Sequence, residues 1–312
     1  MNVAPRAPIA VIDLGTNTVL MLIGRSDGQG GVQIMADQHA IGRLGQGVDA
    51  HRRIRPEALV RVCAIMQQYA GQARQLGVVS VRAFGTSALR DATNRQEVCD
   101  LIQTRTGIEL SVVDGMDEAR LTHAGAGLGM DLPASYAVLD IGGGSTEIAV
   151  GSAGHIQEQG TVNLGAVRCT ERFLPMLPPA TEQVERARAA VERLLARLPA
   201  PPRQVPLIGV AGTVTTLGAI DRNIPRFDAD ELNGHVLTAA RVRELSSYLL
   251  SLNYASIRAM PQVNEQRADL ITAGALILHT ALSRWKRPDI IVSTRGMRYG
   301  LLWRELGRLD AA

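Results

Sequence analysis

The chain has 312 residues, a formal net charge of +3 and a pI near 9.0. Hydrophobic residues make up 46% and charged residues 20%, which is typical of a globular protein long enough for two domains with separate cores. Aromatic residues at 3% argue against binding of single-stranded nucleic acid by base stacking, and the single lysine, Lys286, excludes a GxxxxGK[ST] phosphate loop.

The first half of the chain predicts three strands followed by alternating helices and strands. Apolar runs at 9–12 and 19–23 flank a short turn and predict a β-hairpin. The further elements expected, in chain order, are a strand near 32–36, a helix over 56–76, a strand over 79–84, a helix after 93, a strand over 108–113 and a helix over 116–128.

The second half repeats this order. It predicts a hairpin of strands 136–141 and 146–150, a third strand within 156–162, and then helix 181–198, strand 205–210, helices 213–220, 239–252 and 264–283, strand 290–293 and a closing helix from 297. We therefore expect an N-terminal lobe over 1–130 and a C-terminal lobe over 131–312, with the last helix, about 297–312, able to pack back on the first lobe.

Two aspartate-led, glycine-rich turns occupy equivalent places in the two halves. The first is Asp13-Leu14-Gly15-Thr16-Asn17, and the second is Asp140-Ile141-Gly142-Gly143-Gly144-Ser145-Thr146-Glu147. Small residues let backbone N–H groups close around an anion, and Thr16, Asn17 and Ser145 add side-chain donors. Ordinary hairpin turns use the same residue types. Because the turns form a matched pair, we interpret both as phosphate-binding turns.

A duplicated three-stranded start followed by alternating helices and strands is the outline of the ribonuclease H-like fold of actin, hexokinase and Hsp70. In that fold two similar lobes hold a phosphate-bearing ligand in a cleft. Within it the chain closely resembles the exopolyphosphatase and guanosine pentaphosphate phosphohydrolase family, in its short two-domain form. Besides the two turns, the motifs that carry this resemblance are Arg43-Leu44-Gly45-Gln46-Gly47-Val48, Gly85-Thr86-Ser87-Ala88-Leu89-Arg90-Asp91-Ala92, Asp117-Glu118-Ala119-Arg120-Leu121, Gly209-Val210-Ala211-Gly212-Thr213, Asn233-Gly234-His235 and Gly296-Met297-Arg298-Tyr299-Gly300-Leu301.

The second turn also suggests a metal site. Asp140 and Glu147 stand at its two ends, close enough to share one hard cation, and Asp13 is a possible third acid. Taken alone, Asp140 could instead cap the turn and Glu147 could be an exposed strand residue. The resemblance favours metal ligands, because the family's metal-binding acids match these two positions, and it implies Mg²⁺ or Mn²⁺.

The resemblance assigns the catalytic base to Glu118, since the family's catalytic glutamate has this Glu-Ala-Arg-Leu context. From the residues alone, Asp117 and Glu118 are simply acids in a helix's first turn, where the helix dipole favours them. Arg43, Arg90 and Arg298 match positions expected to bind phosphate, although Arg43 and Arg90 could instead be solvated surface arginines. Gly212 and Thr213 open a predicted helix whose N-terminus would suit an anion.

Together these features predict a metal-dependent exopolyphosphatase that removes the terminal phosphate of inorganic polyphosphate through water activated by Glu118. The alternative substrate is guanosine pentaphosphate (pppGpp), which would lose its 5′-terminal phosphate. A more distant alternative is a phosphate or nucleotide sensor that binds without cleaving. The chain ends just after the second lobe, so a preference for shorter polyphosphates is expected, and the resemblance implies a possible homodimer.

The location of the protein is predicted from its hydropathy. The longest apolar run, 270–278, is far too short to span a bilayer. The N-terminus has no basic segment followed by an apolar stretch. We expect a cytoplasmic protein with no membrane partner and no nucleic-acid partner.

Overall fold

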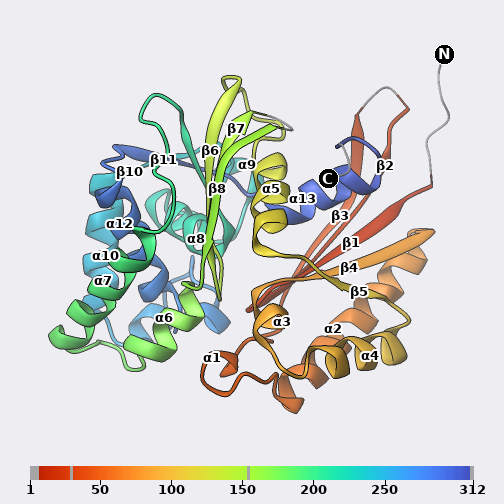
Figure 1. Cartoon of the computed structure of the whole chain (residues 1–312), viewed down its shortest axis with the longest axis horizontal. Coiled ribbons are helices and arrows are strands. Elements are labelled where there is room, and N and C mark those ends of the chain that lie inside the picture. The colour runs from red at the N-terminus through yellow and green to blue at the C-terminus, as the bar shows by residue number, and fades with distance from the viewer. Residues whose placement is uncertain (1–6, 29–30, 153–154, 310–312) are drawn as a thin grey trace. The chain divides into compact units, whose positions relative to one another are not determined.

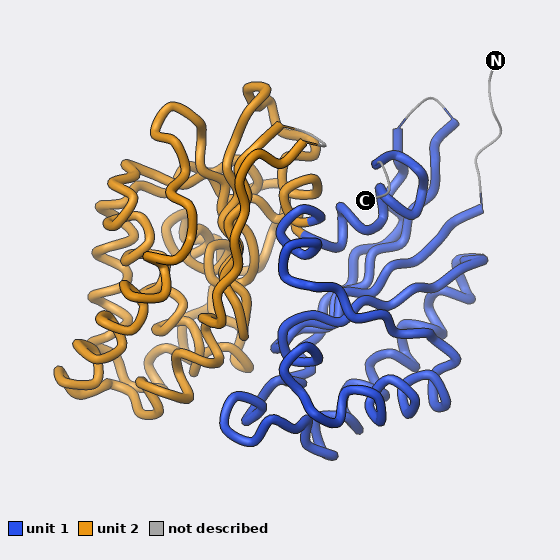
Figure 2. Tube along the Cα trace, in the orientation of Figure 1, with its two compact units in different colours: residues 1–121, 297–312 blue, residues 122–296 orange. Residues whose placement is uncertain are grey.

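The computed structural model describes residues 7–28, 31–152 and 155–309, which form two compact units. Unit 1 contains residues 1–121 and 297–312, and unit 2 contains residues 122–296 (Figure 2). The division therefore falls inside helix α5 (Gly115–Ala126), not near residue 130. The reason is packing: Leu121 joins a core cluster of unit 1, and Ala126 joins one of unit 2. The last three residues of the predicted 297–312 helix lie outside the described residues.

Unit 1 is built on a five-stranded mixed sheet in the order β3-β2-β1-β4-β5 (Figure 1). The first three strands form an antiparallel meander, and β4 and β5 add parallel to β1 on its other side. The bounds are β1 (Ile9–Leu14), β2 (Thr18–Ser26), β3 (Val32–Ile41), β4 (Ser80–Gly85) and β5 (Leu110–Val112).

Both faces of the central strands β1 and β2 are covered, which explains why these strands are apolar runs without clear alternation. Ile12 and its neighbours two residues away pack into one cluster with α2 (Pro56–Gln75) and α4 (Arg95–Thr106). Val11 faces the other way, against α5 and α13 (Met297–Glu305). The C-terminal helix thus packs on the strands of unit 1, where α13 runs beside β1 and β2 (Figure 1).

Unit 2 repeats the same sheet with one extra strand. Its order is β10-β11-β9-β6-β7-β8, in which β6, β7 and β8 are the antiparallel meander and β9 and β11 are the parallel additions. The bounds are β6 (Ser135–Ile141), β7 (Thr146–Ser152), β8 (His155–Val162), β9 (Leu207–Val210), β10 (Val236–Thr238) and β11 (Asp289–Val292). The duplicated ribonuclease H-like fold predicted from the sequence is confirmed.

Four helices of unit 2 pack against α12 (Ile271–Arg284), which is buried almost all round. The predicted helix over 264–283 was wrong at its start, because Asn264 caps a separate 3₁₀ turn (Glu265–Arg267) and α12 begins later. The sequence analysis did not predict several short elements: α1 (Val48–His51), α3 (Ser87–Asp91), α6 (Ala166–Phe173), α9 (Ala229–Leu232), α11 (Tyr254–Arg258) and β10. The other helices are α7 (Thr181–Leu195), α8 (Ala211–Asp221) and α10 (Ala239–Ser251).

Helix α13 approaches the backbone of α5 so closely that it needs a glycine at the contact. A Cβ atom on Gly300 would lie 2.0 Å from the carbonyl oxygen of Leu121. Gly300→Ala should therefore lower the free energy of unfolding by about 1–3 kcal/mol through overpacking. Denaturant unfolding measures the change. Gly296→Ala is the matched control, because nothing lies within 4 Å of its added Cβ, and an equal loss in both variants would contradict the prediction.

A buried histidine predicts that the stability of unit 2 depends on pH. His123 is fully buried and stacks on Tyr136 with ring centroids 4.2 Å apart, and its Nε2 lies 3.2 Å from the Tyr136 carbonyl oxygen. Burial lowers the pKa of His123 below its ordinary 6.5. Below that pH the unfolded chain binds the proton that the folded chain refuses, so stability is full above about pH 6.5 and falls as the pH drops further.

His123→Phe should therefore reduce the loss of melting temperature between about pH 7.5 and pH 5.5, because phenylalanine keeps a ring but does not titrate. Thermal melts of both proteins at the two pH values measure the effect. A pH dependence that is the same in wild type and variant would show that other groups are responsible.

Candidate active site

The first glycine-rich turn is held by the loop that follows β3. The N–H of Gly45 donates to the carbonyl of Thr16 at 2.8 Å, and the N–H groups of Gly42 and Arg43 both donate to the carbonyl of Asn17 at 3.0 Å. Arg43 adopts a left-handed φ of 47° there, which is uncommon for a residue other than glycine. The predicted phosphate residues Thr16, Asn17 and Arg43 therefore lie together.

Thr16 and Asn17 are both largely buried, and Gly15 closes the turn by donating its N–H to the carbonyl of Thr18 at 2.9 Å. The Oδ1 atom of Asn17 has no hydrogen-bond partner within the described part of the chain. A buried acceptor in this state is typical of a position that takes up water or a ligand.

Glu118 lies opposite Arg90, and the two side chains form a short ion pair. Arg90 Nη1 donates to Glu118 Oε2 at 2.6 Å and to the carbonyl of Val113 at 3.1 Å. Arg90 is carried by α3, which begins where β4 ends, and Thr86 in that connection also hydrogen-bonds to Glu118. The sequence placed these two residues on separate motifs; the fold of unit 1 brings them into contact.

Glu118 differs from its neighbour Asp117 although both are in the first turn of α5. Asp114 caps that turn by accepting from the N–H groups of Met116 and Asp117 at 2.8 Å. The Asp117 side chain is 43% exposed, whereas that of Glu118 is 12% exposed. Burial raises the pKa of Glu118 above its ordinary 4.5, while Arg90 and Thr86 oppose the shift. Glu118 is thus a partly desolvated carboxylate held in one orientation, as a general base requires.

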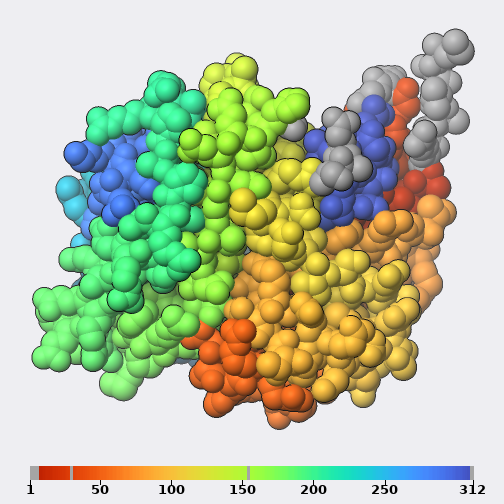
Figure 3. Space-filling model, viewed as in Figure 1, coloured from red at the N-terminus to blue at the C-terminus, as the bar shows by residue number. Residues whose placement is uncertain are grey.

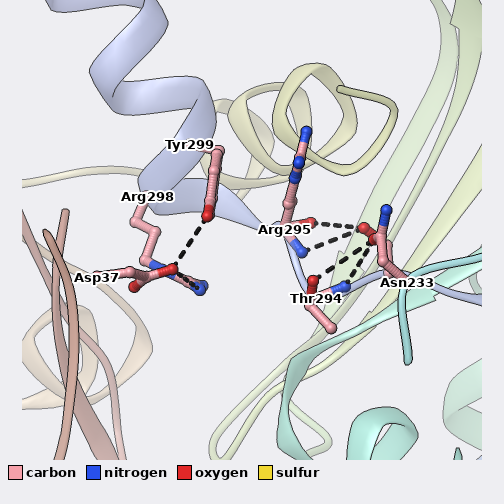
Figure 4. A network of polar contacts seen from close by, with 7 residues as sticks. Asp37, Asn233, Thr294, Arg295, Arg298 and Tyr299 are labelled. Atoms are coloured by element: carbon pink, nitrogen blue, oxygen red, sulfur yellow. Dashed lines mark hydrogen bonds and ion pairs between the residues drawn. The ribbon is translucent and has the colours of Figure 1, made fainter. Parts of the chain in front are cut away.

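Arg298 forms a fork with Asp37 of β3. Its Nε and Nη2 atoms donate to the two Asp37 oxygens at 2.8 Å each, and the Tyr299 hydroxyl donates to Asp37 Oδ2 at 3.0 Å (Figure 4). Asp13 also acts electrostatically on Arg298, so Arg298 lies near the first turn. Tyr299 and Arg298 therefore hold the same carboxylate of Asp37.

The two predicted metal ligands of unit 2 face each other across a strand pair. Asp140 on β6 is in register with Glu147 on β7, and in an antiparallel pair such residues share one face of the sheet. Glu147 is only 2% exposed, and the Thr161 hydroxyl of β8 donates to its Oε1 at 2.9 Å. Glu147 is therefore not the exposed strand residue that the sequence left open.

This pair suits a hard cation. Carboxylate oxygens are the ligands that Mg²⁺ and Mn²⁺ prefer, and Mg²⁺ is commonly held by one or two carboxylates while water and phosphate oxygens fill the other positions. Among the described residues no three acidic, histidine or cysteine side chains gather closely enough to hold a metal. A cation at Asp140 and Glu147 would therefore keep several positions for water or substrate.

The second glycine-rich turn rests on the N-terminus of α6. Gly142 donates its N–H to the Ser145 carbonyl at 3.0 Å, which closes the turn as Gly15 closes the first. Its carbonyls bind the amides that open α6, and the buried Arg168 donates from Nε to the Gly144 carbonyl at 2.8 Å. The sequence analysis did not predict a role for Arg168. The available signal was an arginine within the otherwise apolar segment 166–169.

The connection from β9 to α8 is the third predicted phosphate element. Ala211 there has a left-handed φ of 68°, an uncommon backbone conformation that often marks functional sites. A Cβ on Gly212 would overlap the Arg267 guanidinium, so Arg267 lies directly against this helix start. Burial lowers the pKa of Arg267 to about 10. The buried Thr213 packs against Gly274 of α12.

The surface of unit 1 also exposes arginines outside the predicted site. Arg52 and Arg53, which follow α1, are 54% and 58% exposed and pair with Asp91 and Glu97. The α1 segment lies at the surface in the space-filling view (Figure 3). These pairs are ordinary surface ion pairs.

The described helices include none that is both long enough and apolar enough to cross a membrane.

These parts define the class of protein: a duplicated α/β protein of actin-type fold in which each half carries a glycine-rich turn. The sequence model of the Ppx/GppA phosphatase family matches residues 22–309. The chain therefore belongs to the Ppx/GppA phosphatase family, and it is a hydrolase.

Individual relatives and solved structures support the same family membership. The chain is 34% identical over 286 residues to "Exopolyphosphatase 2" of Mycobacterium tuberculosis, covering 86% of this chain and 88% of the relative. A solved exopolyphosphatase from Cytophaga hutchinsonii is similar with a TM-score of 0.87 and 25% identity, covering 97% and 99%. A Ppx/GppA family member from Aquifex aeolicus is similar with a TM-score of 0.80 and 26% identity, covering 98% and 99%.

Proposed function

We propose that this protein is an exopolyphosphatase that removes the terminal phosphate of inorganic polyphosphate. The observation that carries the proposal is the partly buried Arg90–Glu118 pair, because it supplies an oriented carboxylate of raised pKa beside a guanidinium. The relatives named exopolyphosphatase support polyphosphate as the substrate.

In the proposed reaction a water molecule attacks the terminal phosphorus in line with the bridging oxygen. Glu118 accepts the proton of the attacking water, and the bond from phosphorus to the bridging oxygen breaks, which releases inorganic phosphate and a chain shorter by one unit. Arg90 orients Glu118 through its 2.6 Å contact and adds positive charge for phosphoryl oxygens. The backbone N–H groups of the two turns supply further donors.

Asp140 and Glu147 are the proposed ligands of Mg²⁺ or Mn²⁺. When bound, the cation would spread the negative charge of the phosphates and of the leaving group. Thr161 would act behind it by orienting Glu147 through their 2.9 Å hydrogen bond. Arg298 has a supporting role in this scheme, because its fork to Asp37 holds α13 to β3.

Phosphate release from defined substrates tests the proposal. The purified protein with Mg²⁺ would be given polyphosphates of several defined lengths, guanosine pentaphosphate (pppGpp) and ATP. The proposal expects the largest kcat/KM on a polyphosphate, and the length series measures the expected preference for short chains. A larger kcat/KM on pppGpp would establish the alternative substrate, and binding of all three without release would establish a sensor.

A further inference from the structure

Three successive carbonyl groups of the second glycine-rich turn accept hydrogen bonds from α6. Gly142 accepts from the N–H of Ala166 at 2.9 Å, and Gly143 accepts from the N–H of Val167 at 2.9 Å. The third carbonyl, that of Gly144, accepts from Arg168 Nε at 2.8 Å. The amides that open α6 therefore reach two carbonyls, and a side chain serves the third.

This arrangement fixes where the amides of the turn point. In a trans peptide the N–H of one residue is directed opposite to the carbonyl of the residue before it. With the carbonyls turned toward α6, the N–H groups of Gly143, Gly144 and Ser145 must point away from it. Successive N–H groups on one side of a turn form an anion-binding concavity.

The contact leaves no room for another side chain. A Cβ on Gly165 would lie 2.4 Å from the carbonyl carbon and oxygen of Gly143 and 2.5 Å from the nitrogen of Gly144. Glycine at 165 is therefore required for α6 to lie against the turn. Arg168, one helical turn later, is 6% exposed beside Val167 and Cys169, where a guanidinium is costly to bury.

Unit 1 shows the same device without an arginine. There the equivalent third carbonyl, that of Asn17, accepts from two backbone amides, those of Gly42 and Arg43. The comparison between the two copies indicates that the third carbonyl needs a donor. In unit 2 the helix start does not supply one from its backbone, so Arg168 supplies it.

We infer that Arg168 is a positioning residue for phosphate: its guanidinium holds the Gly144 carbonyl, so that the Ser145 N–H is presented to a phosphate oxygen. A charged donor on the carbonyl also polarises the peptide and makes that N–H a stronger donor. This inference deepens the proposed function and rests on it for the identity of the substrate, but the anion site itself can be tested without catalysis.

The test uses the full-length protein labelled with ¹⁵N-glycine and ¹⁵N-serine, with inorganic phosphate as the probe. In wild type, phosphate should shift the amide signals of Gly143, Gly144 and Ser145. Arg168→Met should weaken phosphate binding by about ten- to a hundred-fold, the range for a lost hydrogen bond to a charged group, and should remove the Ser145 shift. Arg168→Lys, which keeps a donor, should recover part of both.

Arg172→Met is the matched control, because Arg172 lies on the same helix with an exposed side chain, and its phosphate affinity should equal that of wild type. Melting temperatures report folding, and if Arg168→Met does not fold, Arg168→Lys decides the result. Unchanged phosphate affinity and Ser145 shift in the folded Arg168 variants would overturn the inference, as would turn amides that ignore phosphate in wild type. Loss of the proposed function would look different: phosphate would still shift the amides, but no polyphosphate would be cleaved.

Discussion

Glu118→Gln is expected to lower kcat for phosphate release by about 10²–10⁴-fold, because glutamine keeps the shape and the contact to Arg90 but cannot accept the proton of water. Steady-state phosphate release at saturating substrate measures the change. Asp117→Asn is the matched control, since Asp117 is the adjacent acid of the same turn and its side chain is 43% exposed. The control should stay close to wild type.

The same variant should not be destabilised at neutral pH. Burial raises the pKa of Glu118, so the folded protein holds this proton more tightly than the unfolded chain does. Between the ordinary pKa of 4.5 and the raised value, stability therefore falls as the pH rises, and above that window the ionised group costs stability. The melting temperature of Glu118→Gln at about pH 7 should equal or exceed that of wild type. Near wild-type kcat in the folded variant would remove Glu118 as the base.

Glu147→Gln is expected to weaken Mn²⁺ binding by more than the roughly 10–100-fold typical of changes to residues behind a metal ligand. Activity at moderate metal concentration should fall with it, because the amide keeps the volume of Glu147 but loses its charge. Electron paramagnetic resonance of free Mn²⁺ gives the affinity without substrate or turnover. Asp140→Asn should behave in the same way, since the two residues are in register.

Two further variants sharpen this test. Thr161→Val removes the hydroxyl that donates to Glu147, and it should cost about 10–100-fold in Mn²⁺ affinity, less than the loss of the ligand itself. Glu158→Gln is the matched control, because Glu158 is an exposed acid on the neighbouring strand β8. Mn²⁺ affinity that is unchanged in both Asp140→Asn and Glu147→Gln would exclude these acids as the metal site.

Much of the fold could be predicted from the sequence because its signals are local. The first two strands of each meander are short apolar runs on either side of a glycine-rich turn, and long helices such as α2 and α7 have regular apolar spacing. The duplication was visible because the turns recur in the same order. The start of α12 was not predicted, since 264–283 has one continuous pattern, and only the capping of a 3₁₀ turn by Asn264 separates its two parts.

Part of the candidate site could likewise be predicted from the sequence and part could not. The residue types and the two turns were evident from the sequence, and so was the closeness of Asp140 to Glu147, because six residues of hairpin separate them. The role of Arg168 was not evident, because nothing in its own segment indicates that its guanidinium will donate to a carbonyl 24 residues earlier in the chain.

The sequence by itself determined the order of the longer strands and helices along each half, the turns and the acids available for chemistry, since these follow from short-range spacing. The tertiary structure alone decided that the Glu118 side chain lies against Arg90 and is only 12% exposed while that of Asp117 is 43% exposed, and that Arg168 supports the second turn. Each of these depends on which distant segments pack together, and burial and charge are properties of that packing.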